Sequence, residues 1–138
     1  MTIELVPLCT MTGLLGTPFD LGKTSAGTRL IFEVLEGGAE GERLSGTMRG
    51  RVNADWLTIG PDGTGTVDVR LLLDTHDGAL VLIQYIGRFD ATVPGAPIYS
   101  APRFDTGDAR YQWLNKIQAV AKGTLDGTTL TYEVCEAR

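Results

Sequence analysis

The sequence predicts an all-β fold, a single antiparallel barrel of about eight to ten strands that spans residues 1–138. Apolar residues recur with a period of two along most of the chain, which is the spacing of a half-buried strand. Turn residues separate these short apolar runs, and the 18 glycines are scattered among Asp, Thr and Pro instead of being gathered in a linker. Strands in this number tend to curl into a barrel because closure removes exposed edges, so a two-layer sandwich is the second choice.

The first half of the chain contains four predicted strands separated by turns. Branched and aromatic residues with partial alternation mark these strands. They are expected at Ile3–Thr12, Thr28–Leu35, Leu44–Val52 and Trp56–Ile59. The segment Phe19–Gly27 contains two glycines and is predicted to be a loop.

The clearest strand covers Thr66–Asp74, with the sequence TVDVRLLLD. One of its faces is wholly apolar, while the other face carries charges. The apolar face consists of Val67, Val69, Leu71 and Leu73, and the other face of Asp68, Arg70, Leu72 and Asp74. The segment Thr75–Gly78 (THDG) leads into a second apolar run, Ala79–Arg88, and an Asp-Gly pair between two such runs predicts a hairpin.

The C-terminal third begins with a long proline-rich segment. Ala91–Asp108 contains three prolines, and we expect it to contribute no central strand because proline cannot donate to a sheet. A loop of this length is often functional. Arg110–Lys116 (RYQWLNK) is predicted to form a short helical turn. Two further strands are expected at Ile117–Lys122 and Thr128–Cys135, with a turn at Leu125–Gly127 between them.

Composition and charge narrow the classes of partner. The net charge of -5 and the lack of a Lys/Arg cluster disfavour nucleic acid. The longest apolar stretch, Ala79–Gly87, is too short to span a membrane, and the N-terminus does not resemble a signal peptide, so a cytoplasmic location is expected. Two cysteines and one histidine are too few for a zinc site, no phosphate-binding loop precedes a helix, and neither metal nor cofactor is expected. Cys9 and Cys135 are expected to be free thiols.

The charged face of the Thr66–Asp74 strand allows two interpretations. If the apolar face packs the core, the charges are solvated, which is the commoner arrangement because charged residues are rarely buried unpaired. If a subunit or a neighbouring segment covers the apolar face, the charges line a cavity. Arg70 would then hold a carboxylate, enolate or phenolate, and Asp68 or Asp74 would orient it.

Asp55 and Tyr85 are the candidate proton-transfer residues. Asp55 precedes a strand, where it is either a turn residue or a general acid–base at a barrel mouth. Tyr85 lies mid-strand, and a tyrosine there is more often a packing residue than a catalytic one. His76, the only histidine, falls in a predicted turn, which gives a Ser-His-Asp triad little support. Further candidate substrate-binding residues are Trp56, Tyr99 and Arg103.

Two runs of the sequence resemble the signatures of a known family. They are ADWLTIGPDGTGTVDVRLLLDTHDGALVLIQYIGR (54–88) and APRFDTGDARYQWLNKIQAVAKG (101–123), and they are similar to the family called domain of unknown function 3237. The resemblance implies a small calycin- or lipocalin-like barrel, often assembled as oligomers. It also implies a fold-level analogy to cofactor-free enzymes that act on phenolic acids. The recurrent family positions that packing explains poorly are Asp55, Arg70, Trp113 and Asn115.

Three functions remain open. The first is a cofactor-independent acid–base enzyme, a lyase, isomerase or hydratase, whose small aromatic or unsaturated substrate is walled by Trp56, Tyr99 and Trp113. The second is a carrier or sensor that binds a small apolar molecule without turning it over. The third is a structural barrel in which the Thr66–Asp74 strand forms an oligomer face. The expected partners are a small apolar or aromatic ligand and further copies of the chain, in a dimer or larger homo-oligomer.

Overall fold

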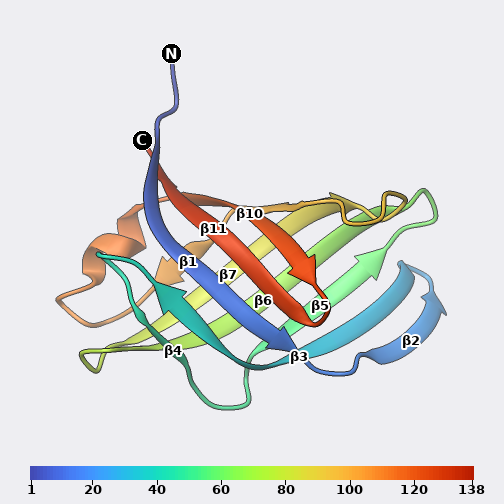
Figure 1. The fold of residues 1–138 in the computed structure, drawn as a ribbon, viewed down its shortest axis with the longest axis horizontal. Coiled ribbons are helices and arrows are strands. Elements are labelled where there is room, and N and C mark those ends of the chain that lie inside the picture. Colours follow the sequence, from blue (N-terminus) through green and yellow to red (C-terminus); the bar gives the residue numbers. More distant parts are fainter.

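Eight strands close into an antiparallel barrel in the computed structural model, which describes residues 1–138 (Figure 1). Each strand pairs with the next one in the ring, and β11 returns to pair with β1, so the ring is closed. The strands of the ring are β1 (Leu5–Leu15), β3 (Gly27–Glu40), β5 (Ala54–Ile59), β6 (Thr64–Thr75), β7 (Leu80–Asp90), β8 (Ile98–Ser100), β10 (Ala119–Asp126) and β11 (Thr129–Ala137). Their order around the barrel follows the sequence, which confirms the predicted all-β barrel.

Three short strands and one helix are added to the ring. β2 (Phe19–Thr24) pairs with β3, β4 (Gly46–Met48) pairs with β3 and β6, and β9 (Arg103–Asp105) pairs with β7. The only helix is the 3-10 segment η1 (Gln112–Lys116), which confirms the short helical turn predicted there. No helix has the length and apolar character that crossing a membrane would require.

The prediction of a loop at Phe19–Gly27 is wrong. β2 and β3 form a hairpin across this segment, in which Thr24 pairs with Gly27. Gly22 and Gly27 have φ angles of 71° and 116°, which side chains other than glycine rarely adopt. The two glycines therefore supply the bulge and the tight turn of a hairpin, and they do not interrupt the sheet.

Two other segments also differ from prediction. β8 lies between β7 and β10 and completes the ring, so Ala91–Asp108 does contribute a central strand. Pro97 comes directly before β8 and Pro102 follows it, so no proline occupies a hydrogen-bonding position within the strand. The strand expected at Leu44–Val52 is reduced to the three residues of β4, because Gly50 (φ 71°) turns the chain.

Alternation along β6 sets the interior of the barrel. Its apolar face, from Val67 to Leu73, is buried in the core, where it packs with inward residues of β1, β7 and β11. The core continues to one end of the barrel, where Leu114 of η1 and Tyr111, the residue before η1, are buried. The charged face of β6 is left outside, so the structure selects the solvated interpretation of these charges.

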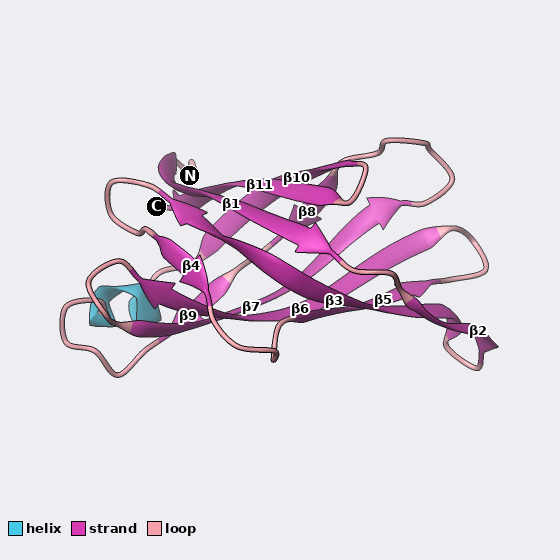
Figure 2. Ribbon diagram, turned by 60° about the horizontal axis from the view of Figure 1, so that its bottom comes forward, coloured by secondary structure: helices cyan, strands magenta, loops and turns pink.

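The two ends of the barrel differ in what covers them (Figures 1 and 2). At the helix end, η1 lies near the β6–β7 turn, and Tyr111 donates a hydrogen bond of 2.9 Å from its hydroxyl to Asp77 in that turn. At the opposite end, called the loop end here, lie the β5–β6 turn, the β7–β8 loop and the β10–β11 turn. Only the helix end is plugged by a helix, so the loop end is the natural entrance to the interior.

Candidate functional site

A cavity of about 420 Å³ occupies the loop end of the barrel. Its walls are apolar side chains of the strands, and its rim is the β7–β8 loop together with Leu125 near the end of β10. The wall residues are Leu15, Phe32, Leu57, Val67, Phe89 and Leu130. Asp55 is the only ionisable residue in the lining, and a cavity of this size fits a small organic molecule.

Other hollows of similar size lie outside the barrel, between turns and along β1 and β11. Apolar residues are a minority of their linings, whereas they dominate the lining of the barrel cavity. None of these outer hollows contains a buried carboxyl group. The barrel cavity is therefore the candidate site.

Asp55 enters the barrel from the start of β5. It pairs with Phe32 on β3 and Val69 on β6, and its side chain takes the inward direction of the alternation. The residue is only 5% exposed, and its Oδ1 atom has no hydrogen-bond partner. Burial raises the pKa of the Asp55 carboxyl from 3.8 to about 7, because a charged carboxylate is poorly solvated there. A carboxyl group that titrates near neutrality can both donate and accept a proton.

Two buried tyrosines lie close to Asp55. Tyr85 pairs with Val69, so Asp55, Val69 and Tyr85 form one row across β5, β6 and β7. The Tyr85 ring meets the ring of Tyr132 on β11 edge to face, with 5.2 Å between the ring centres. Burial is the largest cause that raises the pKa of each tyrosine, and the charge of nearby Asp55 adds to it. Both phenols therefore stay protonated across the neutral range.

A second, smaller cavity lies deeper in the barrel. It measures about 20 Å³, is lined by Tyr85 and Tyr132, and shares Leu15 and Leu130 with the main cavity. The Tyr132 hydroxyl is buried without a hydrogen-bond partner. Sequence reasoning missed Tyr132, although the apolar face of the last strand, Leu130, Tyr132 and Val134, contained the signal. A tyrosine on a fully buried face needs a partner for its hydroxyl.

Arg70, Asp68 and Trp56 do not reach this site. Arg70 and Asp68 lie on the outer face of β6 and are exposed, because the inward positions of that strand are occupied by valine and leucine. Trp56 follows Asp55 directly, points outward and is 47% exposed. The expectation that Arg70 holds an anion inside the barrel therefore has no geometric support, and Trp56 does not wall the cavity.

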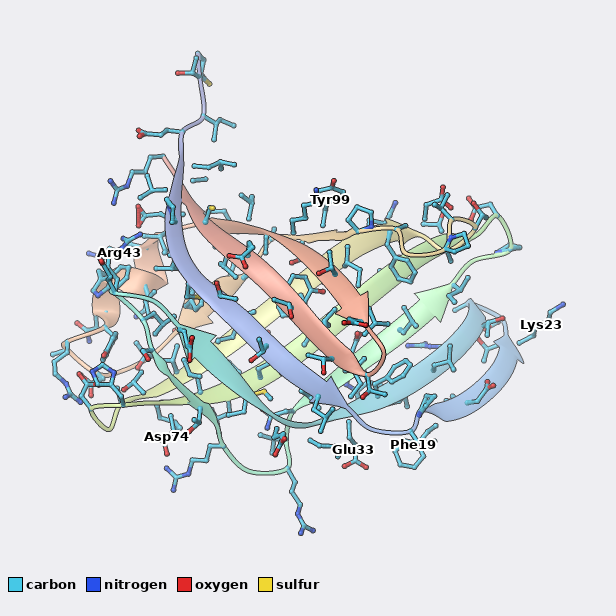
Figure 3. All side chains as sticks on the ribbon, viewed as in Figure 1. Phe19, Lys23, Glu33, Arg43, Asp74 and Tyr99 are labelled. Carbon is cyan, nitrogen blue, oxygen red and sulfur yellow. The ribbon has the colours of Figure 1, made fainter.

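The predicted residues of the proline-rich segment also lie outside. Tyr99 on β8 is 55% exposed, points away from the barrel (Figure 3), and lies beside the ammonium group of Lys122. Arg103 on β9 is exposed. The segment contributes to the site through other residues, since Val93, Pro94 and Ala96 form the rim of the cavity.

Trp113 and Asn115 lie at the helix end, away from the cavity. The Arg43 guanidinium lies 5.3 Å from the centre of the Trp113 ring and forms an ion pair of 3.2 Å with Glu136. The Asn115 amide makes two hydrogen bonds of 2.9 Å with the backbone of Thr106, one as acceptor and one as donor. These contacts fasten η1 to the barrel, so both residues have structural roles in this conformation.

The two cysteines and the histidine lie outside the lining of the barrel cavity. No three residues among the His, Cys, Asp and Glu side chains are arranged to hold a metal ion. Cys9 and Cys135 are both free thiols, and burial raises the pKa of Cys9 to about 12. His76 lies in the exposed β6–β7 turn, where its Nδ1 atom is 3.2 Å from the carbonyl oxygen of Ser45. Of the nine predicted site residues, the structure brings together Asp55 and Tyr85 alone.

The sequence profile of one family matches almost the whole chain. It is described as "Protein of unknown function (DUF3237)", and it matches residues 3–137. The chain is 31% identical over 127 residues to a UPF0311 protein of Rhodopseudomonas palustris, an alignment that covers 82% of each protein. A crystal structure of a β-barrel-like protein from Acinetobacter baumannii superposes with a TM-score of 0.90 at 29% identity, over 100% of this chain and 98% of that one.

The chain is also similar to a protein sequence and to a protein structure from the fungus Penicillium herquei. The chain is 35% identical over 88 residues to its hydroalkoxylation enzyme phnH, which covers 63% of this chain and 52% of that protein. A crystal structure of an enzyme from the same fungus superposes with a TM-score of 0.72 at 26% identity, over 99% of this chain and 94% of that one. The barrel is thus similar both to proteins of unknown function and to an enzyme.

Proposed function

The chain belongs to the DUF3237 family of proteins of unknown function, and from this premise we propose that it is a cofactor-independent acid–base enzyme. Its substrate is a small, uncharged, unsaturated organic molecule bound in the barrel, and Asp55 transfers the proton. One observation carries the proposal: the only ionisable group of an apolar cavity is a buried carboxyl whose pKa is raised to about 7.

Asp55 suits proton transfer better than Tyr85 does. A general acid–base works best when its pKa lies near the working pH, because both protonation states are then populated. The pKa of Tyr85 is raised well above its ordinary value by burial, so its phenolate form is scarce. Tyr85 is therefore a hydrogen-bond donor in this proposal, and Asp55 moves the proton.

The lining of the cavity supports an uncharged substrate. No lysine, arginine or histidine lines it, so a carboxylate or phenolate would enter an apolar space without a counter-ion and next to Asp55. Burying such an unpaired anion is costly. An anionic substrate was expected only if Arg70 pointed inward. Because Arg70 points outward, we propose a neutral substrate instead.

Similarity to a hydroalkoxylation enzyme supports one reaction class, the addition of an O–H group across a carbon–carbon double bond. Protonated Asp55 would give its proton to one alkene carbon, and the substrate hydroxyl oxygen would bond to the other carbon. The hydroxyl proton would then return to the Asp55 carboxylate. One O–H bond and one C=C π bond become one C–H and one C–O bond, so the step needs no oxidant or reductant.

A cyclisation assay tests this proposal. The probe is 2-(2-methylallyl)phenol, whose protonation gives a tertiary carbocation and whose addition product is 2,2-dimethyl-2,3-dihydrobenzofuran. We expect the wild-type protein to form this ether and Asp55→Asn to lower kcat by about 100-fold or more. The matched control is Asp105→Asn, an exposed residue of β9 outside the cavity lining, which should leave kcat unchanged. Equal rates for wild type and Asp55→Asn would refute the assignment.

A non-catalytic carrier is the second candidate, favoured by the apolar walls of the cavity. A carrier would bind the same probe with similar affinity in wild type and Asp55→Asn, and neither would release a product. Calorimetry is the suitable method, because Trp56 lies on the outer surface and Trp113 at the helix end, so neither tryptophan reports on the cavity. Binding without turnover across a panel of unsaturated alcohols would favour the carrier.

A further inference from the structure

We propose that Tyr132 is a second ligand-binding group of this barrel, and that its hydroxyl donates a hydrogen bond to an oxygen atom of an uncharged phenol or ketone. The apolar part of that ligand fills the main cavity, and its oxygen atom lies at the inner end, next to Tyr132. The inference deepens the proposed function, on whose cavity it rests, but it concerns binding and not turnover.

The Tyr132 hydroxyl is an unsatisfied group in the centre of the fold. Tyr132 is 2% exposed, and no hydrogen bond of ordinary geometry reaches its hydroxyl oxygen, although the Tyr85 side chain lies close enough to affect its pKa. A buried hydroxyl without a partner lowers the stability of the folded state, so native proteins rarely keep one unless a ligand or water completes it. Asp55 Oδ1 also lacks a hydrogen-bond partner, and the charge of this carboxyl acts on Tyr132. The interior therefore contains two unsatisfied polar groups near each other.

The fold holds the Tyr132 ring in one place. A Cβ atom at Gly123, the cross-strand partner of Tyr132 on β10, would clash with the Tyr132 ring, so only glycine permits this position of the ring. On its other side the ring meets Tyr85 edge to face. The hydroxyl is thus fixed by two neighbours before any ligand binds, which reduces the entropy lost on binding.

The space next to Tyr132 has the size of a single oxygen-bearing group. The inner cavity measures about 20 Å³, little more than one water-sized probe occupies. It shares Leu15 and Leu130 with the main cavity of about 420 Å³. A ligand that spans both therefore has a large apolar part and a small polar end.

The chemistry of Tyr132 selects a neutral acceptor. Burial raises its pKa, so the phenol stays protonated and donates. The charge of Asp55 lies nearby and no basic residue lines either cavity, which disfavours a phenolate or carboxylate. A ketone oxygen or a neutral phenol oxygen meets all of these conditions.

Calorimetric binding of a matched ligand pair tests the inference. The probes are 2-allylphenol and allylbenzene, which differ by one hydroxyl group. Tyr132→Phe should weaken the binding of 2-allylphenol by about 5-fold and leave that of allylbenzene unchanged, which is the size of one net hydrogen bond. The control is Tyr99→Phe, which removes a hydroxyl from the outer surface and should change neither affinity.

A second probe and a stability measurement complete the test. 4-Phenylbutan-2-one only accepts hydrogen bonds, so it should show the same loss with Tyr132→Phe. That variant should melt at or above the wild-type Tm, because it removes an unpartnered hydroxyl. Equal weakening for both members of the pair, or none, overturns the role of Tyr132. Weaker binding of 2-allylphenol alone supports the role of Tyr132 even if Asp55→Asn leaves turnover unchanged. The binding role of Tyr132 and the catalytic role of Asp55 can therefore fail independently, and the two failures give different results.

Discussion

Asp55 and Trp56 are adjacent in the chain and lie on opposite sides of the barrel wall. Asp55 is 5% exposed and faces the cavity, while Trp56 is 47% exposed and faces solvent. Strand alternation therefore places the carboxyl group, and not the larger aromatic side chain, in the interior. A protein that packs a carboxyl where a tryptophan would bury more apolar surface gives up stability, which is typical of functional sites.

The cost of burying Asp55 predicts a specific pH dependence of stability. The folded-state pKa of about 7 lies above the unfolded value of 3.8, so between these pH values the folded protein holds a proton that the unfolded chain has lost. The contribution of Asp55 to the free energy of unfolding therefore falls as pH rises from about 4 to 7 and then levels off. The total fall is on the order of 4 kcal/mol, since each pKa unit corresponds to about 1.4 kcal/mol.

Urea unfolding of Asp55→Asn beside wild type at pH 5, 6, 7 and 8 measures this effect. The neutral amide cannot titrate, so the stability of the variant relative to wild type should increase up to about pH 7 and stay constant above it. Asp105→Asn, with its exposed side chain on β9, is the control and should show no such trend. A relative stability of Asp55→Asn that does not change with pH would contradict the raised pKa.

Filling the cavity should block binding without unfolding the barrel. Leu57 lines the cavity one inward position along β5 from Asp55, and about 420 Å³ of space lies beside it. Leu57→Trp is expected to abolish calorimetric binding of 2-allylphenol at a stability cost of about 1–3 kcal/mol from overpacking. Thr58→Trp, on the opposite face of the same strand, should keep binding. Retained affinity in Leu57→Trp would show that the ligand binds elsewhere.

Asn115→Ala should affect stability and not catalysis. The substitution removes both hydrogen bonds of the Asn115 side chain to the Thr106 backbone, which join η1 to the segment after β9. The loss should lower the free energy of unfolding by about 1–3 kcal/mol, because backbone polar groups are left unpaired. The kcat of the cyclisation, measured below the melting transition, should equal that of wild type. A lower kcat in the folded variant would show that Asn115 contributes to catalysis.

Asp77 should stabilise the helix end in a pH-dependent way. Its carboxylate accepts a hydrogen bond of 2.6 Å from the Thr75 hydroxyl and one of 2.9 Å from Tyr111, and its pKa is lowered, chiefly by Thr75. A lowered pKa contributes stability above the unfolded value of 3.8, and this is lost as pH falls through the folded value. Thermal melts should show Asp77→Asn less stable than wild type at pH 6, with the difference shrinking below pH 4. A constant difference would contradict the assignment.

Local rules predicted most of the strands. The period-two pattern of Thr66–Asp74 and the Asp-Gly turn after it reappear as β6, the β6–β7 turn and β7. The rules failed where a glycine or a proline predicts the end of a strand but the structure has that residue within or next to a strand. Gly22 provides a bulge within β2, and Pro97 borders β8 without entering it. Only the closure of the ring, a non-local condition, shows that these segments pair.

The candidate site was predicted in part. Asp55 is a candidate in the sequence and lines the cavity in the structure, but the sequence does not show that Arg70 points away from the cavity, since that depends on which face of β6 becomes the interior. Trp113 and Asn115 stood out because packing alone explained them poorly, and the structure places both in contacts that hold η1. The sequence does not single out Tyr132, because the aromatic ring that it contacts, Tyr85, is 47 positions earlier in the chain.

The carboxyl pKa of Asp55 is the measurement that tests the central claim most directly. Carbon-detected NMR of aspartate-labelled protein, with Asp55→Asn to assign the resonance, gives the titration midpoint of this one group. A midpoint near 7 that moves when 2-allylphenol is added is the result that a buried acid–base group at the ligand site predicts. A midpoint near 4 that ignores the ligand would mean that Asp55 is solvated, and the site would have to be sought elsewhere.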